Sequence, residues 1–282
     1  MTALADADYA YLRDVVFQNS RNLLQPSHDH LFRTRLTGLL RRQGLTHLHD
    51  LVYLLRTGAD TDLERAVAEA MTINETSFFR DCKSFDLLRA EVLPRLIEAR
   101  RATRRLRLWS AASSTGQEAY SLAILLREHF PQLWGWDIRI EGTDISAEVV
   151  RRARLGRYQR IEMNRGLPAR FLVRYFDHSG EDWVIKPEIA KVCNFRQANL
   201  CAPLPFLERF DAILMRNVML YFSLETRCTL LAATHRLLAP DGCLFLGAAE
   251  QPPDRSLWET VFSGGTTYYR PLSPDLGFRG CC

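Results

Sequence analysis

The stretch Leu106–Leu126, with the sequence LRLWSAASSTGQEAYSLAILL, decides how the rest of the chain is interpreted. Leu106, Leu108 and Trp109 belong to a short apolar run typical of a strand. Ser110–Gly116 is small and polar, as a tight turn at the end of a strand requires. Glu118–Leu126 then carries apolar residues at helical spacing. Small side chains and free helix N–H groups admit a ligand, so this unit is typical of the opening of a nucleotide-binding α/β sheet.

The same stretch lacks the GxGxxG pattern of dinucleotide sites. By itself it leaves open a plain turn between a strand and a helix. A second signal comes from Asp144, which follows the apolar strand predicted at Ile138–Ile140. An acid at the end of the second strand is the position that holds ribose hydroxyls in nucleotide-binding sheets.

Length and composition exclude several classes of protein. The 282 residues suffice for one large domain or two modest ones, and 47% of them are hydrophobic. No apolar run is long enough to span a membrane, and the start MTALADADYAYLRD has acids where a signal peptide has basic and then apolar residues. The net charge of +4 permits an acidic partner without requiring nucleic acid. We therefore expect a cytoplasmic protein.

The seven cysteines are scattered and show no metal-ligand spacing. They are best interpreted as reduced thiols in the cytosol, and no metal site is expected. Cys281 and Cys282 close the chain, and we expect them in an exposed, oxidisable tail.

The first 70 residues predict a small all-helical domain, because apolar residues recur at helical spacing and no strand signal interrupts them. Thr61 is a candidate N-cap for the last of these helices. Arg35 and Arg42, seven residues apart, are expected on one helix face. That face is either a solvated basic surface or a docking surface for an acidic helix.

A linker is expected over residues 71–85, where the sequence TINETSFFRD joins polar residues to two phenylalanines and Arg80. Two consecutive phenylalanines are unusual in a free linker, so this segment should pack against a domain. The alternative is a simple helix cap with an apolar first turn.

An α/β domain is expected over residues 86–272, with a flexible tail at 273–282. A small antiparallel insertion is expected at about 170–190, around an Asp-His-Ser-Gly turn. Alternating strands and helices predict a doubly wound sheet. The later strands are predicted at 192–195, 210–215 and 243–247, with a closing antiparallel pair at 258–262 and 266–270.

Six motifs in this order and spacing resemble those of the CheR chemotaxis receptor methyltransferases. The resemblance covers about residues 8–272. The motifs are TINETSFFRD, LWSAASSTGQEAYSLA, GTDIS, Asn199-Leu200, FDAILMRNVMLYF and PDGCLFLGAAE.

The resemblance implies an S-adenosylmethionine-dependent methyltransferase domain after a helical N-terminal domain. It implies esterification of glutamates on the acidic, cytoplasmic methylation helices of chemoreceptors, in chemotaxis adaptation, by a monomeric enzyme. Arg80 and Tyr221 would be the catalytic residues, beside the substrate glutamate. The cofactor-binding residues carried over by position are Asn74, Thr76, Arg80, Glu118, Asp144, Asn199, Leu200, Arg216 and Asn217.

The chemistry of these residue types suits methyl-ester formation. A glutamate carboxylate is ionised at neutral pH, so its attack on a sulfonium methyl group needs no general base. These motifs supply no histidine for that purpose. Charge is neutralised as the methyl group moves, so a dry, aligned site favours the reaction. We therefore assign Arg80 and Tyr221 to positioning.

The sequence departs from the family pattern at Gln117, where an acid is usual, at Ala119, where proline is usual, and at Ala248-Ala249, where His-Ser is common before Glu250. Of these, Gln117 could alter cofactor affinity. Only six residues lie between Phe176 and Trp183, which resembles family members that act without docking on a receptor's C-terminal peptide.

Two alternatives stay open. The arginine runs would suit a nucleic-acid methyltransferase, but the Asp/Asn-Pro-Pro-Tyr/Phe motif of base-methylating enzymes is replaced by Met215-Arg-Asn-Val-Met219. A non-catalytic signalling module that binds the cofactor or a partner is the other alternative.

Overall fold

The computed structural model describes residues 4–58, 60–133 and 135–272. The chain divides into two compact units. The first comprises residues 1–73 with Tyr221–Thr226, and the second comprises Asn74–Leu220 with the residues from Arg227 onward. The tail expected at 273–282, including Cys281 and Cys282, lies outside the described residues.

The first unit is helical, with one isolated bridge between Asn22 and Phe222. Its core consists of apolar side chains at helical spacing, among them Leu12, Phe32 and Leu51, which are fully buried. The helices are α1 (Asp6–Ser20), α2 (Asp29–Arg35), α3 (Thr37–Arg42), α4 (Leu48–Thr57) and α5 (Thr61–Ala70), with a 3₁₀ turn η1 (Pro26–His28).

Two details of this unit differ from the sequence prediction. The N-cap of α5 is Asp60, whose carboxylate accepts the N–H groups of Asp62 and Leu63 at 3.0 Å, so the prediction of Thr61 as the cap was wrong. Aspartate caps well because its short carboxylate reaches those orphan donors. The helix expected to carry both Arg35 and Arg42 is interrupted at Leu36, between α2 and α3.

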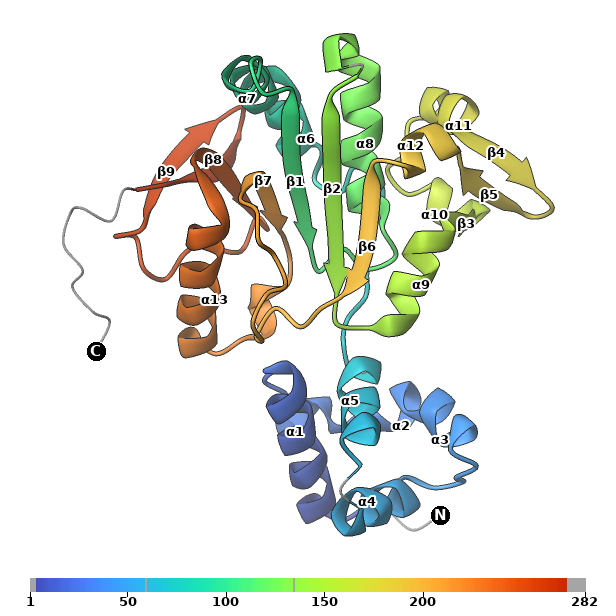
Figure 1. Ribbon diagram of the computed structural model, residues 1–282. Coiled ribbons are helices and arrows are strands. Elements are labelled where there is room, and N and C mark those ends of the chain that lie inside the picture. The colour runs from blue at the N-terminus through green and yellow to red at the C-terminus, as the bar shows by residue number, and fades with distance from the viewer. Residues whose placement is uncertain (1–3, 59, 134, 273–282) are drawn as a thin grey trace. The chain divides into compact units, whose positions relative to one another are not determined.

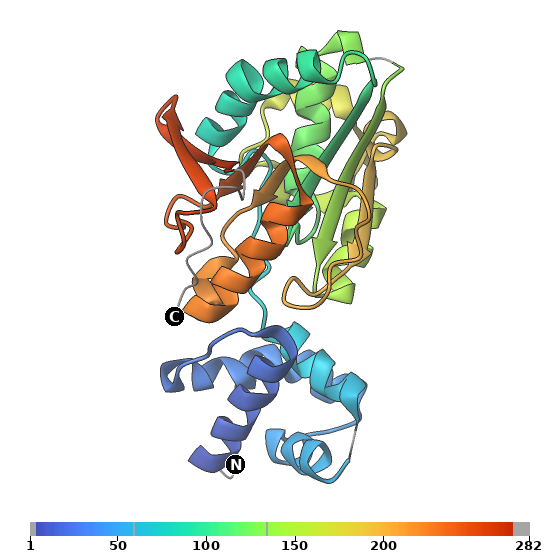
Figure 2. The same cartoon turned by 60° about the vertical axis from the view of Figure 1, so that its left-hand side comes forward.

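A seven-stranded sheet organises the second unit (Figure 1). The strand order is β6-β2-β1-β7-β8-β10-β9, and the first five strands pair in parallel. The last two pair antiparallel, and Figure 2 shows their hairpin in red at the edge of the sheet. The strands are β1 (Arg105–Ala111), β2 (Asp137–Asp144), β6 (Cys193–Gln197), β7 (Phe210–Met215), β8 (Leu238–Leu246), β9 (Trp258–Ser263) and β10 (Thr266–Pro271).

The central strands are continuously apolar because both of their faces are covered. All residues of β7 are buried, and so are all residues of β1 except Arg105. The prediction of a doubly wound α/β sheet is therefore confirmed. The longer helical elements are α6 (Cys82–Leu87), α7 (Leu93–Ala99), α8 (Gln117–His129), α9 (Ala147–Leu155) and α13 (Leu224–Leu237), with a π-helical segment η2 (Leu88–Val92) before Pro94 and 3₁₀ turns η3 (Pro131–Leu133) and η4 (Met219–Tyr221). The end of η4 and the first three residues of α13 are grouped with the first unit.

A second, antiparallel sheet has the order β3-β5-β4. The β4–β5 hairpin turns at Gly180, whose φ of 68° favours glycine. The strand β3 precedes the range of 170–190 expected for the insertion, because three residues after α9 pair with β5. The elements here are β3 (Arg157–Gln159), α10 (Arg160–Met163), α11 (Ala169–Tyr175), β4 (Phe176–Ser179), β5 (Asp182–Ile185) and α12 (Pro187–Ala190).

No helix within the described ranges is long and apolar enough to cross a membrane. None of the five cysteines that the structure describes forms a disulfide. Burial raises the pKa of the Cys243 thiol to about 12, so it is an inert core residue.

Candidate functional site

Strained backbone gathers at the carboxyl ends of the parallel strands. In the loop after β1, Ala112 and Ser114 have φ values of 57° and 51°. Asn217, after β7, has a φ of 60°, and in the preceding linker Phe79 and Asp81 have φ values of 49° and 53°. Residues other than glycine rarely adopt a positive φ. Where they do, the surrounding structure holds the backbone in place, and such positions are common at functional sites.

Asp144, the last residue of β2, fixes the loop after β1. Its carboxylate accepts the N–H of Ser114 at 2.9 Å and the N–H of Ser146 at 3.0 Å. The residue is 6% exposed. The acid predicted from the sequence to hold ribose hydroxyls therefore also orders the backbone around it.

Arg216, directly after β7, is the centre of a buried polar cluster. Its side chain is 2% exposed and donates to Glu118 Oε2 at 3.0 Å and to Asp81 Oδ2 at 2.6 Å. It also donates to the carbonyl oxygen of Arg80 at 2.8 Å. One guanidinium thus joins the end of β7, the start of α8 and the linker.

Glu118 is the acid of this cluster, in the first turn of α8. It accepts from the Ser110 hydroxyl at 2.7 Å and from Arg216. Burial raises the pKa of the Glu118 carboxyl, while the nearby Arg216 guanidinium and the Ser110 hydroxyl oppose that rise. The two donors therefore fix the position of the Glu118 carboxyl group.

The linker is anchored along its length within the second unit. The Asn74 carbonyl accepts from the Ser114 hydroxyl at 2.7 Å, and the Phe79 N–H donates to Ser121 Oγ at 2.9 Å. Phe78 is fully buried, with its ring edge-on to Tyr158 and Phe176. The paired phenylalanines therefore pack into a domain core, as their apolar character requires.

Arg80 forms a hydrogen bond with an earlier residue of the same linker. Its Nη1 donates to the carbonyl of Glu75 at 2.9 Å, and the Glu75 carboxylate pairs with Arg165 at 2.6 Å. The hydrogen bond and charge of Arg165 hold the pKa of the Glu75 carboxyl below its usual range. Thr76 lies between them and is partly exposed.

Asn199 and Leu200 follow β6, the strand beside β2. The Asn199 side-chain oxygen accepts the Cys201 N–H at 3.0 Å, which closes a local turn. Leu200 is 8% exposed. Both residues thus lie in the turn that follows the carboxyl end of β6, as the motif order implied.

Tyr221 belongs to the first unit by its contacts. Its carbonyl accepts the Leu23 N–H at 2.8 Å, next to the bridge between Asn22 and Phe222. The convergence of Arg80 and Tyr221 on one substrate group stays a prediction.

Several buried polar atoms of the site have no hydrogen-bond partner within the described part of the chain. They are Ser113 Oγ, Arg216 Nε and Asn217 Oδ1. Buried polar atoms are normally bonded, so unbonded ones that gather after β1 and β7 mark a place where a polar ligand would complete the set. S-adenosylmethionine, the cofactor that the family resemblance implies, has an ammonium, a carboxylate and hydroxyl groups that could pair with such atoms.

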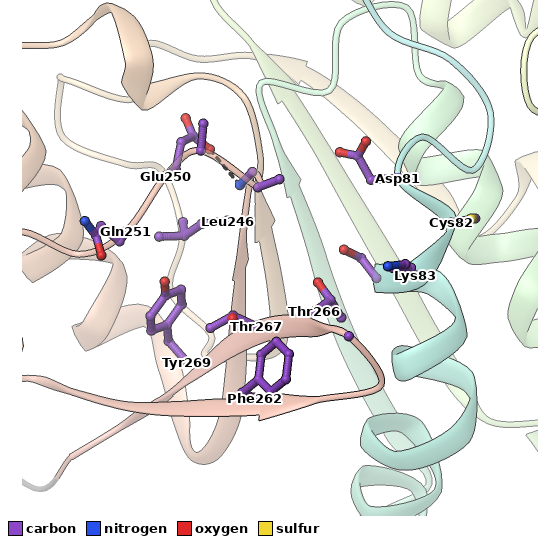
Figure 3. A pocket seen from close by; sticks show the side chains of 15 residues that line it. Asp81, Cys82, Lys83, Leu246, Glu250, Gln251, Phe262, Thr266, Thr267 and Tyr269 are labelled. Carbon is purple, nitrogen blue, oxygen red and sulfur yellow. Dashed lines mark hydrogen bonds between the residues drawn. The ribbon is translucent and has the colours of Figure 1, made fainter.

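A pocket of about 720 Å³ adjoins the cluster within the second unit. Figure 3 shows Asp81 and Lys83 on one side of this pocket and Glu250 and Tyr269 on the other. Phe262, on the edge strand β9, is 74% exposed at its rim. None of the residues carried over by the family resemblance lines the pocket.

Sequence reasoning did not find three side chains of this region: Ser110, Asp81 and Glu250. Asp81 directly follows Arg80 in the linker motif, and Ser110 is the first residue of the small polar stretch after Trp109. Their polar character inside otherwise apolar motifs was the available signal. Gln117, the departure from the usual acid, accepts the Thr115 hydroxyl at 2.7 Å and is 2% exposed.

No group of three or more His, Cys, Asp and Glu side chains in the described ranges could hold a metal ion.

Comparison with known proteins places these features in one family. Residues 74–267 match the family described as "CheR methyltransferase, SAM binding domain". "Chemotaxis protein methyltransferase 1" of Pseudomonas aeruginosa is 38% identical over 250 residues, which cover 87% of this chain and 90% of that protein. "Chemotaxis protein methyltransferase Cher2" of Pseudomonas putida is 37% identical, with 81% and 84% covered, and the "Chemotaxis protein methyltransferase" of Escherichia coli is 34% identical, with 88% and 85% covered. The chain therefore belongs to the CheR methyltransferase family, and residues 74–267 are its S-adenosylmethionine-binding domain.

Proposed function

We propose that this protein transfers the methyl group of S-adenosylmethionine to glutamate side-chain carboxylates on the cytoplasmic helices of chemoreceptors, in chemotaxis adaptation. The observation that carries the proposal is the Arg216 cluster, a buried guanidinium with an unbonded Nε at the carboxyl end of β7. The family membership and the names of the relatives support the same activity.

We assign the cofactor site to the polar groups after the parallel strands. Asp144 offers carboxylate lone pairs to ribose hydroxyls, and Asn217 Oδ1 offers a buried acceptor to a donor such as the ammonium group. Glu118 and Arg216 hold each other in place and fix the linker above them. The remaining members of the proposed set are Asn74, Thr76, Arg80, Asn199 and Leu200.

The proposed methyl transfer needs alignment of the reacting groups and no general base. Bound S-adenosylmethionine supplies a methyl group on a sulfonium cation. The attacking glutamate is already an anion, so the chain's residues need only hold it in line and exclude water. Arg80 and Tyr221 are proposed to orient the carboxylate. A strong ion pair with the nucleophile would slow the transfer, and the Arg80 guanidinium already bonds to the Glu75 carbonyl.

The protein substrate is proposed to approach through the pocket beside Asp81. Lys83 is an exposed cation on its wall, and an exposed aromatic ring such as Phe262 favours contact with another protein. The exposed Arg42 of the helical unit offers a second attraction for an acidic receptor helix. We place this activity in the cytoplasm, where those helices lie.

The experiment is incubation with methyl-labelled S-adenosylmethionine and receptor cytoplasmic fragments. A carboxyl methyl ester is hydrolysed by mild base, so base-labile label on glutamates would support the proposal. Base-stable label, or label on nucleic acid, would contradict it. Binding of S-adenosylhomocysteine without any transfer would favour a non-catalytic signalling module.

A further inference from the structure

Glu250 lies in the turn after β8 and has no role in the site described so far. We infer that Glu250 is a positioning residue, which holds the Arg216–Met219 turn so that Asn217 can meet the cofactor. The inference rests on the proposed function, because it gives Asn217 a ligand to meet.

The carboxylate of Glu250 accepts three backbone N–H groups, each at 2.7 Å. Oε2 accepts from Asn217 and from Gly247, and Oε1 accepts from Met219. Glu250 is 8% exposed, and its own N–H donates to the Gly247 carbonyl at 2.9 Å. Figure 3 shows the bond between Glu250 and the end of β8 beside the pocket. One side chain thus ties the ends of β7 and β8 together.

The turn held in this way is strained and incompletely bonded. Asn217 has a φ of 60°, and its Oδ1 is buried without a partner among the described residues. Without the two charge-assisted bonds from Glu250 to Asn217 and Met219, the backbone would relax out of the left-handed region, and Oδ1 would turn toward another donor. The pre-formed direction of this acceptor therefore depends on Glu250.

The ends of β7 and β8 approach so closely that position 247 has no room for a side chain, which explains the glycine there. A Cβ atom there would lie 2.6 Å from Glu250 Oε2 and 2.9 Å from the Asn217 nitrogen. Met219, whose N–H is the third donor, begins the 3₁₀ turn η4 that ends at Tyr221. Glu250 is thus connected through the backbone both to Asn217, which is proposed to bind the cofactor, and to Tyr221, which is proposed to orient the substrate carboxylate.

The first test is Glu250→Gln, which keeps the shape and removes the charge. A glutamine has a single acceptor oxygen, so at least one of the three N–H groups must face an NH₂ group. We expect the dissociation constant of S-adenosylhomocysteine, measured by calorimetry, to rise about ten- to hundredfold. The matched control is Glu259→Gln on β9, an exposed acid 3.6 Å from Arg270, which should leave affinity unchanged.

The second test separates positioning from simple stabilisation. Asn217→Gly removes the side chain and suits the left-handed backbone. If Glu250 acts through Asn217, adding Glu250→Gln to Asn217→Gly should change the affinity less than twofold further. A purely structural Glu250 would lower the melting temperature in both backgrounds, with an unchanged affinity or the same fold-change in each, and either result would overturn the inference.

Gly247→Ala provides an independent variant if Glu250→Gln does not fold. It pushes the same groups apart while leaving every charge in place, and it should weaken binding in the same direction. Unchanged affinity in folded Gly247→Ala would count against the inference. If the wild-type protein itself fails to bind S-adenosylhomocysteine, the proposed function fails instead, so the two failures are distinguishable.

Discussion

Replacement of Arg216 by methionine tests whether this buried guanidinium stabilises the site through its ion pairs with Glu118 and Asp81. In Arg216→Met, a flexible apolar side chain of similar length replaces a guanidinium that is 2% exposed. Glu118, 13% exposed, loses its cationic partner but keeps the Ser110 hydroxyl. Asp81, 46% exposed, loses its partner but can be hydrated. Loss of the Arg216–Glu118 ion pair should therefore cost much more stability than loss of the Arg216–Asp81 ion pair.

The magnitude follows from these exposures. Loss of one partner of a buried ion pair costs about 3–5 kcal/mol. The Asp81 pair is half exposed and contributes at most about 1 kcal/mol. Because Glu118 keeps one donor and can take up a proton, we expect a total loss of about 3 kcal/mol in the free energy of unfolding at pH 8.

The loss should depend on pH, and its sign follows from Glu118. Burial raises the pKa of this carboxyl above its usual value near 4.5, so the ionised form is disfavoured in the folded state. Stability from such a group is fully present below the unfolded-state pKa and is lost as the pH rises through the folded-state pKa. Without Arg216, the folded-state pKa rises further. Arg216→Met should therefore be less destabilised at pH 5 than at pH 8.

Urea unfolding followed by tryptophan fluorescence measures this quantity in the second unit, because residues 1–73 contain no tryptophan. A Glu118→Gln substitution in the Arg216→Met background should restore part of the stability at pH 8 by removing the unpaired charge. A loss below about 1 kcal/mol at pH 8, or equal losses at both pH values, would refute the reasoning.

Three further predictions concern individual side chains. Asp144→Ala should weaken S-adenosylhomocysteine binding about ten- to hundredfold in calorimetry, and, because two backbone N–H groups lose their acceptor, it should also lower the melting temperature. Unchanged affinity would remove Asp144 from the site. Tyr221→Phe should lower turnover of a receptor fragment while cofactor affinity holds, by a factor that is constant from about pH 6.5 to 8.5. A wild-type titration that vanishes in the variant would make Tyr221 an acid or base. Arg42→Glu should raise the Michaelis constant for the receptor and flatten its salt dependence, without changing cofactor affinity. Unchanged receptor kinetics would make Arg42 a solvated surface residue.

The sequence predicted the fold because its signals are repetitive. The stretch at 106–126 forms most of strand β1, the loop after it and most of helix α8, and the apolar runs at 210–215 and 243–247 correspond to β7 and the end of β8. Each such signal is a sum over several side chains whose periodicity reports burial. The strand β3 was missed because three residues, one of them the buried Tyr158, carry no measurable period.

Arg35 illustrates what periodicity does not reveal. The sequence places Arg35 and Arg42 on one face, but Arg35 donates to the carbonyls of Met71 and Thr72 at 2.8 and 3.2 Å. Those carbonyls belong to the C-cap of α5 and to the residue after it, where a cation is favoured. Arg35 therefore holds the chain just beyond α5, and its reversal would affect stability as well as any docking. Only Arg42 remains a clean test of the basic surface.

The site was harder to predict for a physical reason that Asp144 and Glu250 share. Each carboxylate accepts backbone N–H groups, and a backbone donor is present at every non-proline residue, so the partner leaves no mark on the sequence. Side-chain pairs such as Glu118 and Arg216 can be suspected from their types. A turn held in the left-handed region by a distant carboxylate can be recognised only when the chain is folded. Glu250 is separated from Asn217 by 33 positions, yet its carboxylate sets the backbone from which the Asn217 side chain projects. Substitutions at such anchors should therefore alter ligand affinity without removing any group that touches the ligand.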